Sequence, residues 1–178
     1  TILPIQMQSA LKEEEILEAL REIHGPQANF LSQHQRLSIL HATNNTEKHF
    51  HIGTPCGGGK SLAFYLPCVA YKRRGHNFGM TMAVMSYKFL SGHHVEATQN
   101  ALRGLKVPIW IESISSVADL PNSTLPESLS GESLPDLLVV SLDVAAELFK
   151  RFFSLFKVWA SKRQFVRLIF DEFHTLSL

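Results

Sequence analysis

The sequence predicts an α/β fold in which helices flank a parallel sheet, with a helical segment at the N-terminus. Short apolar runs recur along the chain, helix-length segments separate most of them, and an acidic amphipathic stretch precedes them all. Strands that alternate with helices are typical of βαβ units, whose parallel sheets carry helices on their faces. We therefore divide the chain into a helical segment over residues 1–45 and an α/β domain over residues 46–178.

The N-terminal segment contains two predicted helices. Residues 9–24 place apolar side chains at helical spacing, with glutamates toward the N-terminal half, where the helix dipole favours negative charge. Gly25-Pro26 is a typical helix end. A second helix is predicted from Ser32 through Ala42, before Asn44-Asn45.

The α/β domain shows alternating short and long segments. Five apolar runs are predicted strands: 49–54, 79–85, 107–111, 137–141 and 165–170. Three segments between them have helix length: 60–74, 87–105 and 143–160. Residues 113–135 are rich in serine and proline, and they are predicted to form a long surface loop.

Composition limits the class of protein. The chain has 45% hydrophobic and 19% charged residues, which is typical of a globular domain and excludes a disordered one. No apolar run reaches the length of a transmembrane helix. Two cysteines make no disulfide framework, so we expect a reducing compartment inside the cell. The net charge of +1 gives no argument for a polyanionic partner.

The strongest chemical signal is Thr54-Pro-Cys-Gly-Gly-Gly-Lys-Ser61, between a predicted strand and a predicted helix. Its glycines let successive backbone N–H groups surround a phosphate without obstruction by Cβ atoms, and the helix N-terminus favours the same anion. Lys60 is expected to reach the β- and γ-phosphates of ATP, and the Ser61 hydroxyl to ligate Mg²⁺. The expected cofactor-binding glycines are Gly57, Gly58 and Gly59. The alternative is a plain glycine-rich turn.

The second signal is the acidic box in Arg167-Leu-Ile-Phe-Asp-Glu-Phe-His174. An apolar strand delivers Asp171 and Glu172 at its C-terminal end, the edge at which parallel α/β sheets bind ligands. There Asp171 is expected to hold Mg²⁺ and Glu172 to polarise the attacking water. A solvated strand end is the alternative interpretation.

Residues 55–67 resemble the first motif of RecQ-type DNA helicases, where a glycine-rich phosphate loop leads to a Leu-Pro pair. Cys56 stands where that family usually has threonine. Asp-Glu-x-His over 171–174 is similar to the acidic box of DEAH-type superfamily-two helicases, although Phe173 replaces a small residue. The sequence looks closest to the RecQ-like helicases of fungal mobile or subtelomeric elements.

The segment Phe30-Leu-Ser-Gln-His-Gln35 resembles the RecQ motif in which an aromatic residue precedes a glutamine that reads adenine. An amide offers a donor and an acceptor together, as the N6/N7 edge of adenine requires. The resemblance assigns this role to Gln35, with Gln33 as the competing choice. A polar glutamine at a helix start is the alternative.

The resemblance implies the N-terminal RecA-like lobe of an ATP-dependent 3′–5′ DNA helicase, a nuclear enzyme that requires ATP and Mg²⁺. Lys60, Asp171, Glu172 and His174 would be its catalytic residues, with His174 linking the acidic box to motifs outside the chain. The implied partners are single-stranded or forked DNA and a second RecA-like lobe of the same parent chain. Both ends of the chain look truncated, so we expect the isolated lobe to bind nucleotide without appreciable turnover.

Two alternatives stay open. A decayed helicase copy would bind nucleotide or nucleic acid without catalysis, and the polar residues within 47–53 favour it, since central parallel strands are normally apolar. An ATPase of another P-loop family is the third possibility. Lys150, Arg151, Lys157, Lys162 and Arg163 form either a basic face toward nucleic acid or ordinary surface charge.

Overall fold

The computed structural model describes residues 10–44, 52–53, 57–76, 79–85, 93–122, 134–161 and 165–171. Most of the predicted strand 49–54 lies outside these residues, and Ile52 and Gly53 within it form no regular element. Cys56, Glu172 and His174 also lie outside them.

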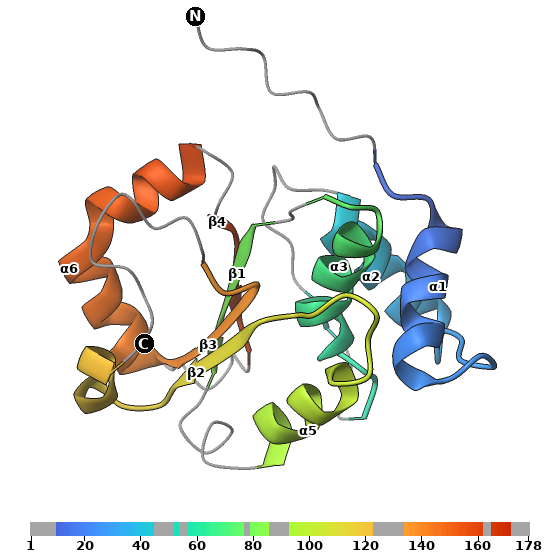
Figure 1. Ribbon diagram of the computed structural model, residues 1–178, viewed down its shortest axis with the longest axis horizontal. Helices are drawn as coiled ribbons and strands as arrows, with labels where there is room; N and C mark the ends of the chain where they lie inside the picture. The colour runs from blue at the N-terminus through green and yellow to red at the C-terminus, as the bar shows by residue number, and fades with distance from the viewer. Residues whose placement is uncertain are drawn as a thin grey trace, which may run out of the picture.

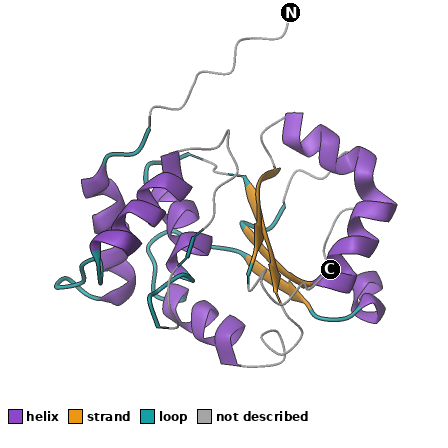
Figure 2. Cartoon of the chain, turned by 180° about the vertical axis from the view of Figure 1, so that it is seen from behind, coloured by secondary structure: helices purple, strands orange, loops and turns teal. Residues whose placement is uncertain are grey.

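The described residues form three layers, with a sheet between two groups of helices (Figures 1 and 2). One face of the sheet carries α1 (Glu13–His24), α2 (Gln33–Asn44), α3 (Leu62–Arg73) and α5 (His93–Leu102). The other face carries α6 (Leu142–Ser161). The strands are β1 (Met80–Met85), β2 (Ile111–Ile114), β3 (Leu137–Ser141) and β4 (Phe165–Phe170).

The sheet has the strand order β2-β3-β1-β4, and every paired strand is parallel. β1 lies between β3 and β4, with Val84 opposite both Val140 and Phe170. Every residue of β1 and β3 is buried, as expected for strands covered by helices on both faces. The predicted α/β fold with a parallel sheet is therefore confirmed.

Two hydrophobic clusters hold the layers together. The first joins α1, α2 and α3 to one sheet face through residues such as Ile16, Ile39 and Leu66. The second packs α6 against the opposite face through Val144, Leu148 and Trp159. Alternation along the strands separates the two clusters, since Ala83 belongs to the first and Val84 to the second.

The N-terminal helices belong to this architecture. The Glu15 carboxylate accepts a hydrogen bond from the Lys12 N–H (2.7 Å) at the start of α1, and Gly25 with φ of 97° ends that helix. α1 and α2 both pack against α3. The predicted helical extension is therefore part of one sheet face.

The strand predicted at 107–111 is wrong in position, because β2 begins at Ile111 and ends at Ile114. Pro108 has no N–H for a ladder, and the Trp110 N–H donates to the Asp136 carboxylate (2.7 Å). The predicted loop 113–135 also begins too early. Its first residues complete β2, and the 3-10 helix η1 follows at Val117–Asn122.

The helix predicted over 60–74 is present, and α3 continues through Pro67. Pro67 removes one helical N–H without ending the helix. α3 is enclosed between α1, α2 and the sheet, so its buried residues run without a break from Ala63 to Tyr71. Packing of this kind outweighs the roughly 3 kcal/mol that a proline costs within a helix.

Candidate nucleotide-binding site

The glycine segment forms a turn that leads directly into α3. Gly57 and Gly59 have φ of 78° and 74°, a left-handed conformation that favours glycine. Carbonyls of the turn accept the first N–H groups of α3, from Leu62 to Gly59 (3.2 Å) and from Ala63 to Lys60 (3.0 Å). Two of the three glycines, Gly57 and Gly59, are therefore required by the backbone.

Ser61 is the residue immediately before α3, and its side chain makes no capping hydrogen bond. Ser61 is exposed, so its hydroxyl is accessible to a ligand that arrives from solvent. A helix N-terminus carries partial positive charge, and an anion at this end would be stabilised by it.

Gln35 comes to the same turn from α2. Its backbone N–H donates to the Ser32 hydroxyl (3.1 Å), which caps the start of that helix. Gln35, Ile39 and Ala42 lie on one helical stripe, and all three are buried. The stripe faces α3, so helical spacing delivers a polar amide to the edge of an apolar contact.

The Gln35 amide is bonded within the protein on both sides. Its Oε1 accepts the Leu31 N–H at 2.7 Å, and its Nε2 donates to the Gly59 carbonyl at 3.5 Å. Only 2% of the residue is exposed. Each amide group keeps one further bonding position, since the NH₂ has a second hydrogen and the oxygen a second lone pair.

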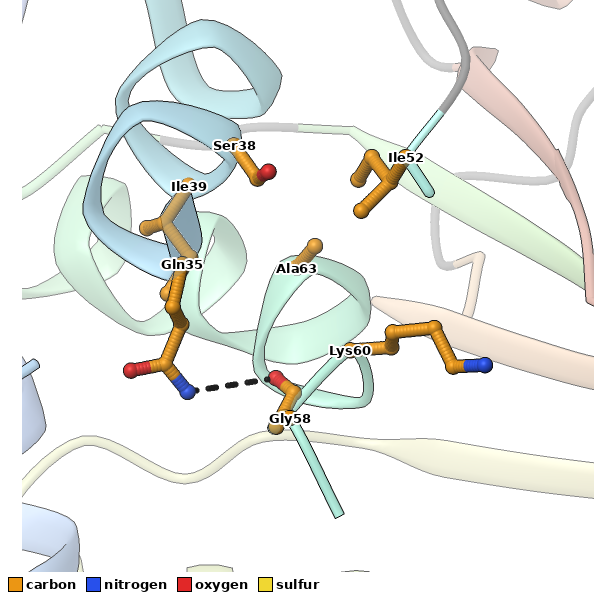
Figure 3. A pocket seen from close by; sticks show the side chains of 8 residues that line it. Gln35, Ser38, Ile39, Ile52, Gly58, Lys60 and Ala63 are labelled. Carbon is orange, nitrogen blue, oxygen red and sulfur yellow. Dashed lines mark hydrogen bonds between the residues drawn. The ribbon is translucent and has the colours of Figure 1, made fainter. Parts of the chain in front are cut away.

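A pocket lies where α2 meets the glycine turn before α3 (Figure 3). Gln35, Ser38 and Ile39 line it from α2, Gly58 and Lys60 line it from the loop, and Ile52 and Ala63 complete it. Figure 3 shows the Lys60 side chain extending away from the Gln35 amide. The amide and the ammonium therefore point in different directions.

Asp171 directly follows β4, and its N–H donates to the Val84 carbonyl (3.0 Å). This bond extends the pairing of β4 with β1 to Asp171 and fixes its backbone at the carboxyl edge of the sheet. Its expected partners Glu172 and His174 lie outside the described residues. Their roles stay predictions.

Ser61 and Asp171, the two expected Mg²⁺ ligands, are thus at the ends of α3 and β4. Within the residues that the structure describes, no group of three or more His, Cys, Asp or Glu side chains is placed to hold a metal ion. Such a cluster is not required here, because Mg²⁺ is commonly held by one or two protein oxygens together with phosphates and water. The donor types at Ser61 and Asp171 suit that arrangement.

Two features of the site were missed by sequence reasoning. Arg167 lies within the apolar strand before the acidic box, and it donates hydrogen bonds to the carbonyls of Ala42 and Ala63. A charged residue inside an otherwise apolar run was the available signal. Sequence reasoning also missed the ion pairs at the far end of α3, where Lys72 pairs with Asp136, Arg73 with Glu18 and Glu22, and Arg74 with Glu15.

The proposed basic face on α6 is partly occupied by contacts within the helix. Arg151 pairs with Glu147 one turn away (2.5 Å), and the Lys157 ammonium lies 4.6 Å from the centre of the Phe153 ring. Lys162 and Arg163 lie outside the described residues. Among the described residues, Lys150 and Lys157 are exposed near Phe153, which is 55% exposed. The choice between a basic face and ordinary surface charge stays open.

Comparison with known proteins adds no relative. No protein-family model matches the chain, and the search of curated proteins finds no significant match. Over the residues described, no helix is both long enough and apolar enough to cross a membrane. The assignment of function rests on the site itself.

Proposed function

We propose that this chain is the ATP-binding lobe of an ATP-dependent DNA helicase of the RecQ type, with a RecA-like fold. The single observation that carries the proposal is the pocket shared by Gln35 and Lys60 at the glycine turn before α3. The pocket joins a hydrogen-bonding amide, a cation and a helix N-terminus. Those are the groups that a purine base and its phosphates require.

Each residue has a chemical role in this proposal. The 57–61 backbone N–H groups surround the phosphates, and Lys60 neutralises charge on the β- and γ-phosphates. Ser61 and Asp171 would hold Mg²⁺, which would lower the phosphate charge that opposes attack by water. Glu172 would orient that water, and His174 would link the box to the partner lobe. Gln35 has one free amide hydrogen and one free lone pair with which to read adenine.

The test is titration of the chain with a fluorescent ATP analogue in the presence of Mg²⁺. Lys60→Ala should abolish measurable binding, whereas Lys157→Ala, which removes an exposed lysine on α6, should leave affinity unchanged. Asp171→Ala should remove the Mg²⁺ dependence of binding. Equal affinity of the wild type and Lys60→Ala would exclude the phosphate-loop assignment.

The DNA partner needs its own measurement, because it rests on resemblance. Fluorescence anisotropy with a labelled single strand should give an affinity that falls as salt rises, as expected when lysines replace counterions on phosphates. ATP should change that affinity, because nucleotide and DNA are coupled in a motor. Salt-independent anisotropy would exclude this partner.

The second candidate is a non-catalytic remnant, and the enclosure of the Gln35 amide favours it. Because Gln35 is 2% exposed and bonded to Leu31 and Gly59, its two remaining bonding positions have little open surface for adenine in this conformation. A remnant would bind ATP and GTP equally and without Mg²⁺ dependence. The proposed lobe would prefer Mg·ATP, so the same titration separates the two.

A further inference from the structure

Pro67 leaves a buried backbone carbonyl in α3 without its helical donor. In an α-helix the carbonyl of Ala63 would accept the N–H of the residue four positions later, and proline has no N–H. Ala63 is 3% exposed, so water does not readily replace the missing donor. Buried carbonyls almost always find a partner.

Arg167 supplies that donor from β4. Its Nη1 lies 3.4 Å from the Ala63 carbonyl oxygen and 2.9 Å from the Ala42 carbonyl oxygen. Ala42 is in the last turn of α2, where carbonyls have no partner within the helix. Nη2 also donates to the Thr81 hydroxyl of β1 at 3.3 Å. One guanidinium thus joins two helices and the sheet.

Hydrogen bonds at both ends of α2 hold it against the glycine turn and the start of α3. Gln35 contacts Gly59 near the start of α2, and Arg167 bridges Ala42 and Ala63 near its end. Arg167 and Ile169 share the face of β4 toward these helices by strand alternation, and Asp171 is the next residue in that series. Arg167, which bonds to the end of α2, therefore lies in the strand that leads to Asp171.

We propose that Arg167 is a positioning residue for the nucleotide site, an inference that rests on the proposed function. Its hydrogen bonds hold α2 in the position that keeps the Gln35 amide in contact with Gly59. A shift of β4 would therefore move α2 and α3. Burial lowers the pKa of Arg167, and the hydrogen bonds to Ala42, Ala63 and Thr81 offset part of the cost of placing its charge there.

Hydrogen exchange at the Leu31 amide reads the position of Gln35 without any nucleotide, since that N–H donates to Gln35 Oε1. Arg167→Met should raise the Leu31 exchange rate about tenfold or more. The matched control is Arg73→Met, which removes an arginine that pairs with α1 and not with the site. It should leave Leu31 exchange unchanged. An unchanged rate in folded Arg167→Met overturns the proposal.

Arg167→Lys decides the matter if Arg167→Met does not fold. A lysine ammonium keeps the charge but lacks the planar fork that reaches three acceptors, so Leu31 exchange should still rise. Exchange equal to that of the wild type would overturn the proposal here as well. The proline adds a further check. Pro67→Ala gives the Ala63 carbonyl a helical donor, so Arg167→Met should lower the urea midpoint less in that background than alone.

Nucleotide binding then tests the consequence for the site. Arg167→Met should weaken ATP binding about tenfold, and it should add little in a Gln35→Ala background because both changes disrupt one contact. A wild type that binds no Mg·ATP would exclude the proposed function. Leu31 exchange would still decide whether Arg167 positions Gln35. Additive losses in ATP affinity would overturn the link between Arg167 and Gln35.

Discussion

Gln35 and Gly59 approach so closely that the glycine cannot carry a side chain. A Cβ atom on Gly59 would lie 1.9 Å from Gln35 Nε2 and 3.1 Å from Cδ. Gly57 has a similar positive φ, but no atom of the described residues lies within 4 Å of its would-be Cβ. Both positions therefore favour glycine because of their backbone conformation. Gly59 must also be glycine because the Gln35 amide lies too close for a side chain.

Gly59→Ala should destabilise the chain more than Gly57→Ala. Both variants carry the strain of a left-handed alanine, about 1–2 kcal/mol. Gly59→Ala must also displace the Gln35 amide from its buried bonds, which adds about 1–3 kcal/mol. Urea unfolding measures the difference, and Gln35→Ala should reduce it, because the clashing atom is then gone. Equal free energies of unfolding for the two alanine variants would contradict the close approach.

Nucleotide preference should depend on Gln35. If its remaining donor and acceptor read adenine, the wild type prefers ATP over GTP, and Gln35→Ala narrows that gap by about 1–3 kcal/mol. Competition between the nucleotides for a fluorescent analogue gives the value. Gln33→Ala is the control, because Gln33 lies at the exposed start of α2. A change confined to Gln33→Ala would move the role to that residue.

Much of the fold could be predicted from the sequence because local patterns indicate most of its helices and strands. β1, β3 and β4 are mostly apolar runs, and α1 and α2 have helical spacing with end signals. β2 was misplaced because Trp110 bonds to the Asp136 side chain, a partner that local pattern does not show. Local pattern also does not show how α3 accommodates Pro67, since the packing and donors that tolerate it come from other elements.

The sequence predicted which residues form the glycine turn, but it did not predict their contacts with distant residues. The glycine turn, Lys60 and Ser61 follow from one segment, and the structure places them before α3 as expected. The bond from Gln35 to Gly59 and the bridge by Arg167 join residues far apart in the chain. Such contacts depend on how α2 packs against α3, which no local pattern encodes. Glu172 and His174 stay predictions.

Asp136 should be a stability determinant of the sheet. Its carboxylate accepts from Lys72 Nζ at 2.6 Å and from the Trp110 N–H at 2.7 Å, and the residue is 7% exposed. Asp136→Ala leaves both donors without this acceptor and should cost about 1.5–3 kcal/mol, the range for hydrogen bonds to a charged group. Asp143→Ala, at an exposed position on α6, is the control and should change unfolding little. Comparable losses in the two variants would argue against this role of Asp136.

Acid should weaken the contact between α1 and α2 through Glu13. The Arg36 guanidinium donates to both carboxylate oxygens of Glu13 at 2.5 Å, and this hydrogen bonding holds the pKa of Glu13 below its ordinary value of 4.5. A carboxyl group whose pKa is lowered by folding stabilises the folded state above its unfolded pKa. That contribution is lost as the pH falls from about 4.5 through the lower folded value.

Glu13→Gln tests this pH dependence, because glutamine keeps the size of the side chain and cannot ionise. The urea midpoint of the wild type should exceed that of Glu13→Gln at about pH 7, and the two should converge at about pH 3. Salt should also shrink the difference at neutral pH, because the pair is partly exposed and screening weakens it. Glu14→Gln is the matched control, since Glu14 is exposed in the same first turn of α1 and feels the same helix dipole. A pH-dependent difference of equal size in Glu14→Gln would assign the effect to the dipole rather than to Arg36.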